Sequence, residues 1–190
     1  MHTGPVVLQL RMYRTFNEFI NRNEQPPMSS TQPEEMSAQL EQKINKLLAE
    51  QCLGVLATKD QDGHPYASLI AFAGNTDHSE LYFVTPRATR KFVNISHDRR
   101  VALLINNTVN QPADFHEAMA VTILGNARLL DDGPRTEVLP IYLKRHPYLQ
   151  QFAKSPSCAM FAIEVTGYTM VQKFQNVSEL RLGHELDANH

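Results

Sequence analysis

A group of cations and hydroxyls follows a strand-like run in the middle of the sequence. Residues 80–92 read ELYFVTPRATRKF, and the apolar run stops at a proline, Pro86. The polar side chains that crowd this end are Thr85, Arg87, Thr89, Arg90 and Lys91. Arginine can give a phosphate two parallel N–H bonds, lysine adds a point charge, and hydroxyls donate further bonds. The segment therefore suggests a phosphate site, although a solvated helix start would explain the same charges.

The residues that follow favour the phosphate. Apolar spacing predicts a helix over Thr89–His97, with Phe92 and Ile95 on one side. The first N–H groups of a helix lack intrahelical partners and attract anions. Cations at that end oppose the helix dipole unless an anion joins them. Arg90 and Lys91 are accordingly the leading candidates, and Arg87 is expected to be solvated.

Other kinds of site find little support. His184 and Glu185 do not form a zinc-binding HExxH motif with the distant His190. Ser68 and Ser157 lack the G-x-S-x-G context of a hydrolase nucleophile. No catalytic acid or base is predicted, and no metal site. The polar stretch 114–117 is expected in solvent or at a dimer rim rather than at a substrate mouth.

Composition limits the class of protein. A chain of 190 residues with 42% hydrophobic residues can build one domain with a sizeable core. A net charge of -2 argues against nucleic-acid binding. No apolar run is long enough to span a bilayer. Cys52 and Cys158 form neither a CxxC motif nor a disulfide-rich pattern, so a reduced, cytoplasmic setting is expected.

The pattern of elements predicts a β-barrel. Polar, proline-containing residues 22–37 indicate a linker, followed by a helix from Ala38 to Gln51 with Ser37 as its N-cap. About six strands follow, mostly joined as antiparallel neighbours, and a closed or partly closed barrel is typical of such a series. The expected strands are Leu53–Lys59, Pro65–Ala73, Glu80–Thr85, Arg100–Asn106, Ala118–Leu130 and Cys158–Phe174.

The sequence supports three further predictions about these elements. The Arg100–Asn106 strand reads RVALLIN, and its nearly continuous apolar run indicates burial on both faces. Gly125 is expected to mark a bulge or bend. Two helices are predicted, over Pro134–Lys144 and from His146 to Phe152. Four of their residues are expected to pack against neighbouring elements: Tyr142, His146, Pro147 and Tyr148.

This order of elements resembles the pyridoxamine 5′-phosphate oxidase-like superfamily of FMN-binding split β-barrels. Four stretches, in this order and at these separations, carry the resemblance: LGVLAT with DGHPY, LYFVTP with TRK, RRVALLI, and VTILGNAR. It implies a mainly β fold, a six-stranded antiparallel split barrel of Greek-key type with flanking helices. The domain would span residues 37–180, after an N-terminal arm at 1–36 and before a polar tail at 181–190.

The resemblance also implies a cofactor and its ligands. In the family the Thr/Ser-Arg-Lys element binds the FMN phosphate, which assigns that role to Arg90 and Lys91, with Thr85 and Thr89 as hydroxyl donors. Strand residues near the phosphate and the flavin ring would complete the site: Tyr66, Ser68, Leu69, Ile70 and Val84. The family pairs as twofold homodimers with the cofactor at the subunit interface. RVALLIN and 118–130 offer apolar surface for such a dimer.

The sequence departs from the oxidase itself at several positions. Ser68, Ala73 and Ala120 stand where the oxidase has arginine, lysine and glutamine. The chain has no tryptophan, and Arg181 and His184 lack the Arg-x-His spacing that binds the oxidase substrate. A flavin-dependent oxidoreductase for another small molecule is therefore expected. The alternatives are a non-enzymatic flavin or haem binding or sensing protein, a deazaflavin protein, or a domain whose site has decayed.

Overall fold

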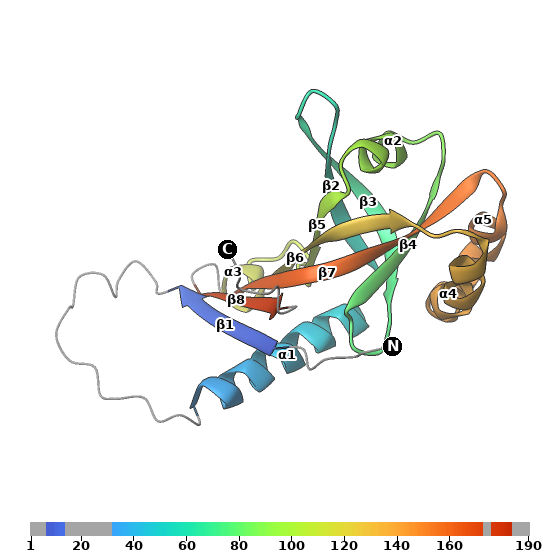
Figure 1. Cartoon of the computed structure of the whole chain (residues 1–190). Coiled ribbons are helices and arrows are strands. Elements are labelled where there is room, and N and C mark those ends of the chain that lie inside the picture. The colour runs from blue at the N-terminus through green and yellow to red at the C-terminus, as the bar shows by residue number, and fades with distance from the viewer. Residues whose placement is uncertain (1–6, 14–31, 173–175, 184–190) are drawn as a thin grey trace, which may run out of the picture.

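The computed structural model describes residues 7–13, 32–172 and 176–183, and its fold is mainly β (Figure 1). The strands are β1 (Val7–Tyr13), β2 (Leu53–Lys59), β3 (Pro65–Gly74), β4 (Glu80–Pro86), β5 (Arg100–Asn106), β6 (Met119–Leu129), β7 (Cys158–Gln172) and β8 (Asn176–Gly183). The helices are α1 (Gln32–Glu50), α2 (Arg90–His97), α3 (Asp114–Glu117), α4 (Asp132–Arg145), the 3₁₀ turn η2 (Pro147–Leu149) and α5 (Gln150–Lys154). Within the described part, no helix is both long and apolar enough to cross a membrane.

Six strands close into an antiparallel barrel in the order β7-β4-β3-β2-β5-β6, because β6 pairs back onto β7. Strands β2, β3 and β4 follow one another directly, and β5 then returns to lie beside β2. This is the Greek-key arrangement, in which a fourth strand returns beside the first. The predicted six-stranded antiparallel barrel of Greek-key type is thus confirmed.

Strand β7 changes partner along its length. Its first half, Cys158–Glu164, pairs with β4, and its second half, from Gly167, pairs with β8. Along its other edge it pairs with β6 throughout. Beyond β8 lies β1, so the sheet continues outside the barrel through two strands that the sequence patterns did not predict. Strand β1 falls in the segment predicted as the N-terminal arm, and β8 spans the end of the predicted domain and the first residues of the predicted polar tail. Residues 184–190 of that tail lie outside the described part.

The bulge predicted at Gly125 is present. The register between β6 and β7 shifts between Leu124 and Gly125. A Cβ atom built on Gly125 would lie 2.4 Å from the carbonyl oxygen of Glu164 and 2.7 Å from the side chain of Ile163. Real Cβ atoms do not approach backbone so closely, and only glycine lets the two strands meet here.

The main core fills the barrel interior, and α1 lies across one end of it (Figure 1). Buried residues at helical spacing carry this contact: Leu40, Ile44, Leu47 and Leu48. The helix begins at Gln32, so the prediction that Ser37 is its N-cap was wrong, and Ser37 lies inside it. Pro33 falls in the first turn, where its missing N–H costs nothing, so the proline-containing stretch extends the helix.

A second core lies on the outer face of β3 and β4, beneath α4 and α5. Tyr142 is fully buried there. His146 is buried, and its Nε2 lies 2.7 Å from the carbonyl oxygen of Phe72. The predicted packing roles of these two residues are confirmed. Tyr148 was predicted to pack as well, but it is 99% exposed, because the η2 turn directs it away from the core.

The outer face of β5 is partly exposed. Burial alternates along this strand, and Leu104 is 38% exposed, so the prediction that RVALLIN is buried on both faces was wrong. A barrel buries only the inward side chains of each strand. The apolar side chains of β5 that point away from the barrel interior therefore lie on the barrel surface.

The bulge gives a test of barrel closure. Replacing Gly125 with alanine forces β6 away from β7 and should lower the free energy of unfolding by about 3 kcal/mol. The matched change Gly133→Ala, at the start of α4, meets nothing within 4 Å and should leave stability unchanged or raise it by about 0.5 kcal/mol. Urea denaturation midpoints at constant slope measure both effects. Equal midpoints for the two variants would contradict the close approach.

Candidate functional site

The predicted phosphate-binding segment forms the turn between β4 and α2. Thr85, the last residue but one of β4, is buried, and its Oγ1 lies 3.0 Å from the Oγ1 of Thr89. Thr89 stands at the N-cap of α2, but its hydroxyl donates to the carbonyl oxygen of Pro86 at 2.9 Å instead of capping the helix. The N–H groups of the first helical turn are consequently left without a side-chain cap.

A buried polar link fixes α2 against the barrel. Asn94, on the buried side of α2, donates from Nδ2 to the Oγ1 of Thr58 at 3.0 Å, and Thr58 donates to the carbonyl oxygen of Tyr66 at 3.3 Å. The chain of bonds joins α2 to β2 and β3. The sequence reasoning missed Asn94 and Thr58; the available signal was an asparagine one position before Ile95, on the apolar side of a short helix.

Arg90 and Lys91 lie over this end of the barrel. The Arg90 guanidinium stands 5.3 Å from the ring centroid of Tyr66, a cation–π contact with β3. Lys91 is half-buried, and desolvation lowers the pKa of its ammonium group. Arg87 is exposed, as expected, and lies 5.6 Å from the ring of Phe92.

These cations are not paired with carboxylates. Several other cations of the described residues do have acidic partners: Lys59 and Arg100 both contact Asp98, and Arg128 contacts Glu80. No carboxylate within the described ranges forms an ion pair with Arg90 or with Lys91. Two uncompensated positive charges thus remain at the N-terminal end of a helix, where the helix dipole also favours an anion.

Ser68 contributes a free hydroxyl on the same face of β3 as Tyr66. Side chains two residues apart on a strand share a face. The Oγ of Ser68 is buried and has no hydrogen-bond partner. A buried hydroxyl without a partner loses its hydration without compensation, at a cost of about 1 to 3 kcal/mol. The site therefore holds an unsatisfied donor close to the Arg90–Tyr66 contact.

The remaining predicted cofactor residues lie elsewhere on the same strands. Leu69 is on the opposite face of β3 and is 61% exposed, whereas Ile70 belongs to the barrel core. Val84 points into the second core beside α4 and α5. The structure brings Arg90 against Tyr66 and Thr85 against Thr89, while Lys91 follows Arg90 on α2 and Ser68 shares the face of β3 that carries Tyr66. Leu69, Ile70 and Val84 do not join these residues through their side chains.

The positions that depart from the oxidase are occupied by small residues in packed surroundings. Ala73 is buried in the second core, beside Tyr82. Ala120 lies on β6, between Asn106 of β5 and Val171 of β7. Neither residue can supply the polar contact that lysine or glutamine makes.

A six-stranded Greek-key split barrel with a cationic helix start at one end defines the class of protein. The family model described as pyridoxamine 5′-phosphate oxidase matches residues 40–172, well over half of the chain. The protein belongs to this family. No curated protein sequence matches it significantly.

Solved structures with the same fold share little sequence with this chain. A haem-binding protein of Mycobacterium smegmatis superposes with a TM-score of 0.64 at 16% identity, covering 71% of this chain and 55% of its own. HutZ of Vibrio cholerae, a haem storage protein, gives 0.60 at 16% identity, covering 72% and 94%. A pyridoxamine 5′-phosphate oxidase of Listeria innocua gives 0.56 at 23% identity, covering 70% and 98%. The chain thus spans little more than half of the Mycobacterium protein.

The half-buried amine of Lys91 gives a direct test of the anion site. Its pKa lies below the ordinary 10.5 because burial disfavours the charged form. A bound phosphate favours the charged form and should raise that pKa. Lysine side-chain NMR titrations with and without inorganic phosphate measure the change, and sodium chloride at equal ionic strength is the control. An unchanged midpoint in phosphate would mean that the amine does not contact the anion.

Proposed function

We propose that this protein binds FMN, with the phosphate held between the start of α2 and strand β3. The observation that carries the proposal is the pair of cations, Arg90 and Lys91, which no carboxylate of the described residues neutralises. A phosphate monoester with nearly two negative charges would compensate them. The membership of the family and the free hydroxyl of Ser68 support the same ligand.

The residues of the site have separate roles in this proposal. Arg90 would give paired N–H bonds to the phosphate, and Lys91 would supply charge from a partly desolvated position. Ser68 and Thr89 would donate hydroxyl bonds. When bound, the flavin supplies hydride or electron transfer, so the chain needs no acid or base of its own for that step. The proposed activity is a flavin-dependent oxidoreductase acting on a small molecule.

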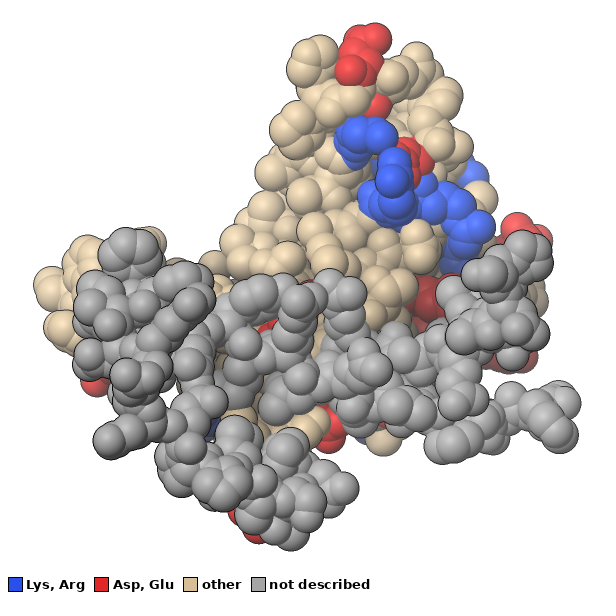
Figure 2. Space-filling view, turned by 60° about the vertical axis from the view of Figure 1, so that its left-hand side comes forward, with Lys and Arg blue, Asp and Glu red and all other residues tan. Residues whose placement is uncertain are grey.

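The homodimer belongs to the same proposal. Adjacent outward positions of β3, β2 and β5 form a cross-strand row, in which Leu69 pairs with Val55 and Val55 pairs with Leu104. The parallel row carries only Ala67, Ala57, Ala102 and Leu124. Neither row contains a charged residue, and Figure 2 shows a broad uncharged area on the barrel beside a band of Lys and Arg. Contiguous exposed apolar surface of this kind is typical of a protein interface.

The second subunit would complete the cofactor site. Leu69 adjoins Ser68 in sequence but points outward, toward the face proposed for the partner. A flavin ring that extends from the phosphate end toward Leu69 would then be covered by the second barrel.

Haem is the second candidate ligand. Two of the solved structures with this fold are haem-binding or haem-storage proteins. A serine at position 68, where the oxidase has arginine, removes one phosphate contact. Haem carboxylates could instead meet Arg90 and Lys91. This role would be binding or sensing rather than oxidation of a substrate.

The phosphate assignment is tested by neutralising both cations. The variant Arg90→Ala/Lys91→Ala loses two charge-assisted contacts and should bind FMN about 100-fold or more weakly than the wild type. Flavin fluorescence quenching measures the dissociation constant. The control Lys46→Ala/Lys154→Ala removes the same charge from exposed positions and should bind FMN as the wild type does. FMN binding that survives in the first variant would contradict the assignment.

The same proteins distinguish the ligand classes. The visible spectrum of the wild type purified with each cofactor should show the bands of oxidised flavin if FMN is bound, and a Soret band if haem is bound. Reduction of bound flavin by NADH or NADPH would then support an oxidoreductase over a sensor. A colourless protein that takes up neither cofactor would support a decayed site.

The dimer is tested on its proposed face. The variant Leu104→Glu would place a charge in an apolar interface and should weaken self-association by about tenfold or more. Sedimentation velocity at micromolar concentration measures the change, and Tyr148→Ser, which alters a fully exposed aromatic away from this face, should not affect it. A wild-type protein that sediments only as a monomer would contradict the dimer.

A further inference from the structure

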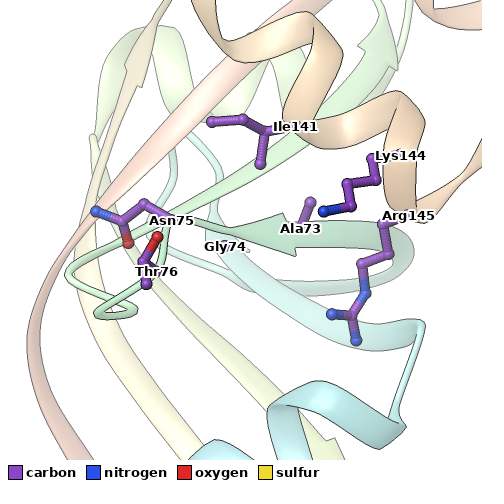
Figure 3. A pocket seen from close by; sticks show the side chains of 7 residues that line it. All are labelled: Ala73, Gly74, Asn75, Thr76, Ile141, Lys144 and Arg145. Atoms are coloured by element: carbon purple, nitrogen blue, oxygen red, sulfur yellow. The ribbon is translucent and has the colours of Figure 1, made fainter.

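An open cleft lies at the other end of β3 from the proposed cofactor site. Its volume is about 500 Å³, which is within the range of small-molecule sites. It is bounded by the turn after β3 and by the last turn of α4 (Figure 3). The lining residues are Ala73, Gly74, Asn75, Thr76, Ile141, Lys144 and Arg145.

The cleft carries positive charge without a lining carboxylate. Figure 3 shows the Lys144 side chain extending from α4 toward Ala73, and no carboxylate within the described residues pairs with it. The acids nearest in sequence to the β3–β4 turn are engaged elsewhere. Asp77 accepts bonds from Ser79, and Glu80 binds Arg128.

Arg145 adds a second, fixed cation. Its Nη2 donates to carbonyl oxygens at the C-terminal end of α1, including that of Ala49 at 3.3 Å, and its guanidinium lies 5.2 Å from the ring of Phe72. The Nε of Arg145 is buried and has no hydrogen-bond partner. One donor of this guanidinium is therefore unsatisfied while the rest of the group is held in place. Desolvation and, after it, the charge of Arg145 lower the pKa of His78.

The turn that forms the opposite wall is preorganised. Asn75 donates from Nδ2 to the Oγ of Ser79 at 2.9 Å, and its Oδ1 accepts from the backbone N–H of Glu80 at 3.0 Å. Thr76 follows at an exposed position with its hydroxyl available. Ile141, which is 40% exposed, gives the cleft apolar surface.

We propose that this cleft binds a small organic anion with an apolar body. Lys144 contacts the anionic group through the ammonium group of its flexible side chain, and the positive charge of Arg145 adds to the attraction. Ile141 packs against the apolar body, and Thr76 offers a hydroxyl to the polar edge. A cleft of this volume suits a small molecule.

The proposed anion site is separate from the proposed cofactor site. Tyr66 and Ala73 are seven positions apart on one extended strand, which places the two sites roughly 20 Å apart. They share no lining residue. The inference therefore stands whether or not the protein binds FMN.

Benzoate, with inorganic phosphate as a second probe and benzyl alcohol as the neutral counterpart, tests the proposal. Benzoate should bind saturably and shift the amide NMR signals of Gly74 and Thr76, whereas benzyl alcohol should not. Saturation by inorganic phosphate at the same amides would show that the anionic group alone is recognised. Lys144→Ala should weaken benzoate binding about tenfold, and Lys144→Arg should largely restore it. Lys154→Ala, an exposed charge on α5, should bind benzoate as the wild type does.

Two results would overturn the proposal. One is the absence of saturable binding by either anion at these amides. The other is benzoate binding that persists in Lys144→Ala but is lost in Arg90→Ala/Lys91→Ala, because the probe would then occupy the cofactor site. Unchanged benzoate binding in that double variant supports the cleft, independently of its FMN affinity.

Discussion

Closure of the barrel depends on the double pairing of β7. This strand pairs with β6 along one edge, while its other edge passes from β4 to β8. A strand can serve three neighbours only if its length and register allow it, and the shift at Gly125 supplies the adjustment where β6 and β7 approach most closely. This closure defines the two ends of the barrel and determines which face of each strand points outward.

The way helices pack against the closed barrel determines where positive side chains remain without a carboxylate partner. One end is covered by α1 through its apolar side, and α2 is fixed against β2 and β3 by the buried bonds of Asn94 and Thr58. This attachment leaves the first turn of α2 facing Tyr66 with Arg90 and Lys91 unpaired. Several other surface cations pair with acidic side chains, as Lys59 and Arg100 do with Asp98. Arg90 and Lys91 stand together at a helix start, where the helix dipole also favours an anion.

The outward faces of the barrel differ in how they are covered. The outer sides of β3 and β4 carry α4 and α5, whose packing also creates the cleft beside Lys144. The outer sides of β2 and β5 carry two cross-strand rows of uncharged side chains, among which Leu104 is 38% exposed. A face of this composition is stable in water when a second surface covers it. The proposed dimer face and the proposed small-molecule site thus lie on different outer faces of the barrel.

The sequence by itself determined the barrel strands, the α2 helix and the cationic segment, because apolar periodicity and turn residues are local signals. It also indicated the bulge at Gly125. It did not reveal β1 and β8, whose pairing is set by distant strands rather than by their own pattern. The early start of α1, the exposure of Leu104 and the outward turn of Tyr148 likewise depend on what surrounds them. The alternation of side chains along β3 already places Ser68 and Tyr66 on one face and Leu69 on the other. Only the tertiary structure showed that Arg90 lies against Tyr66 and that Val84 belongs to the second core, because those contacts join segments that are distant along the chain.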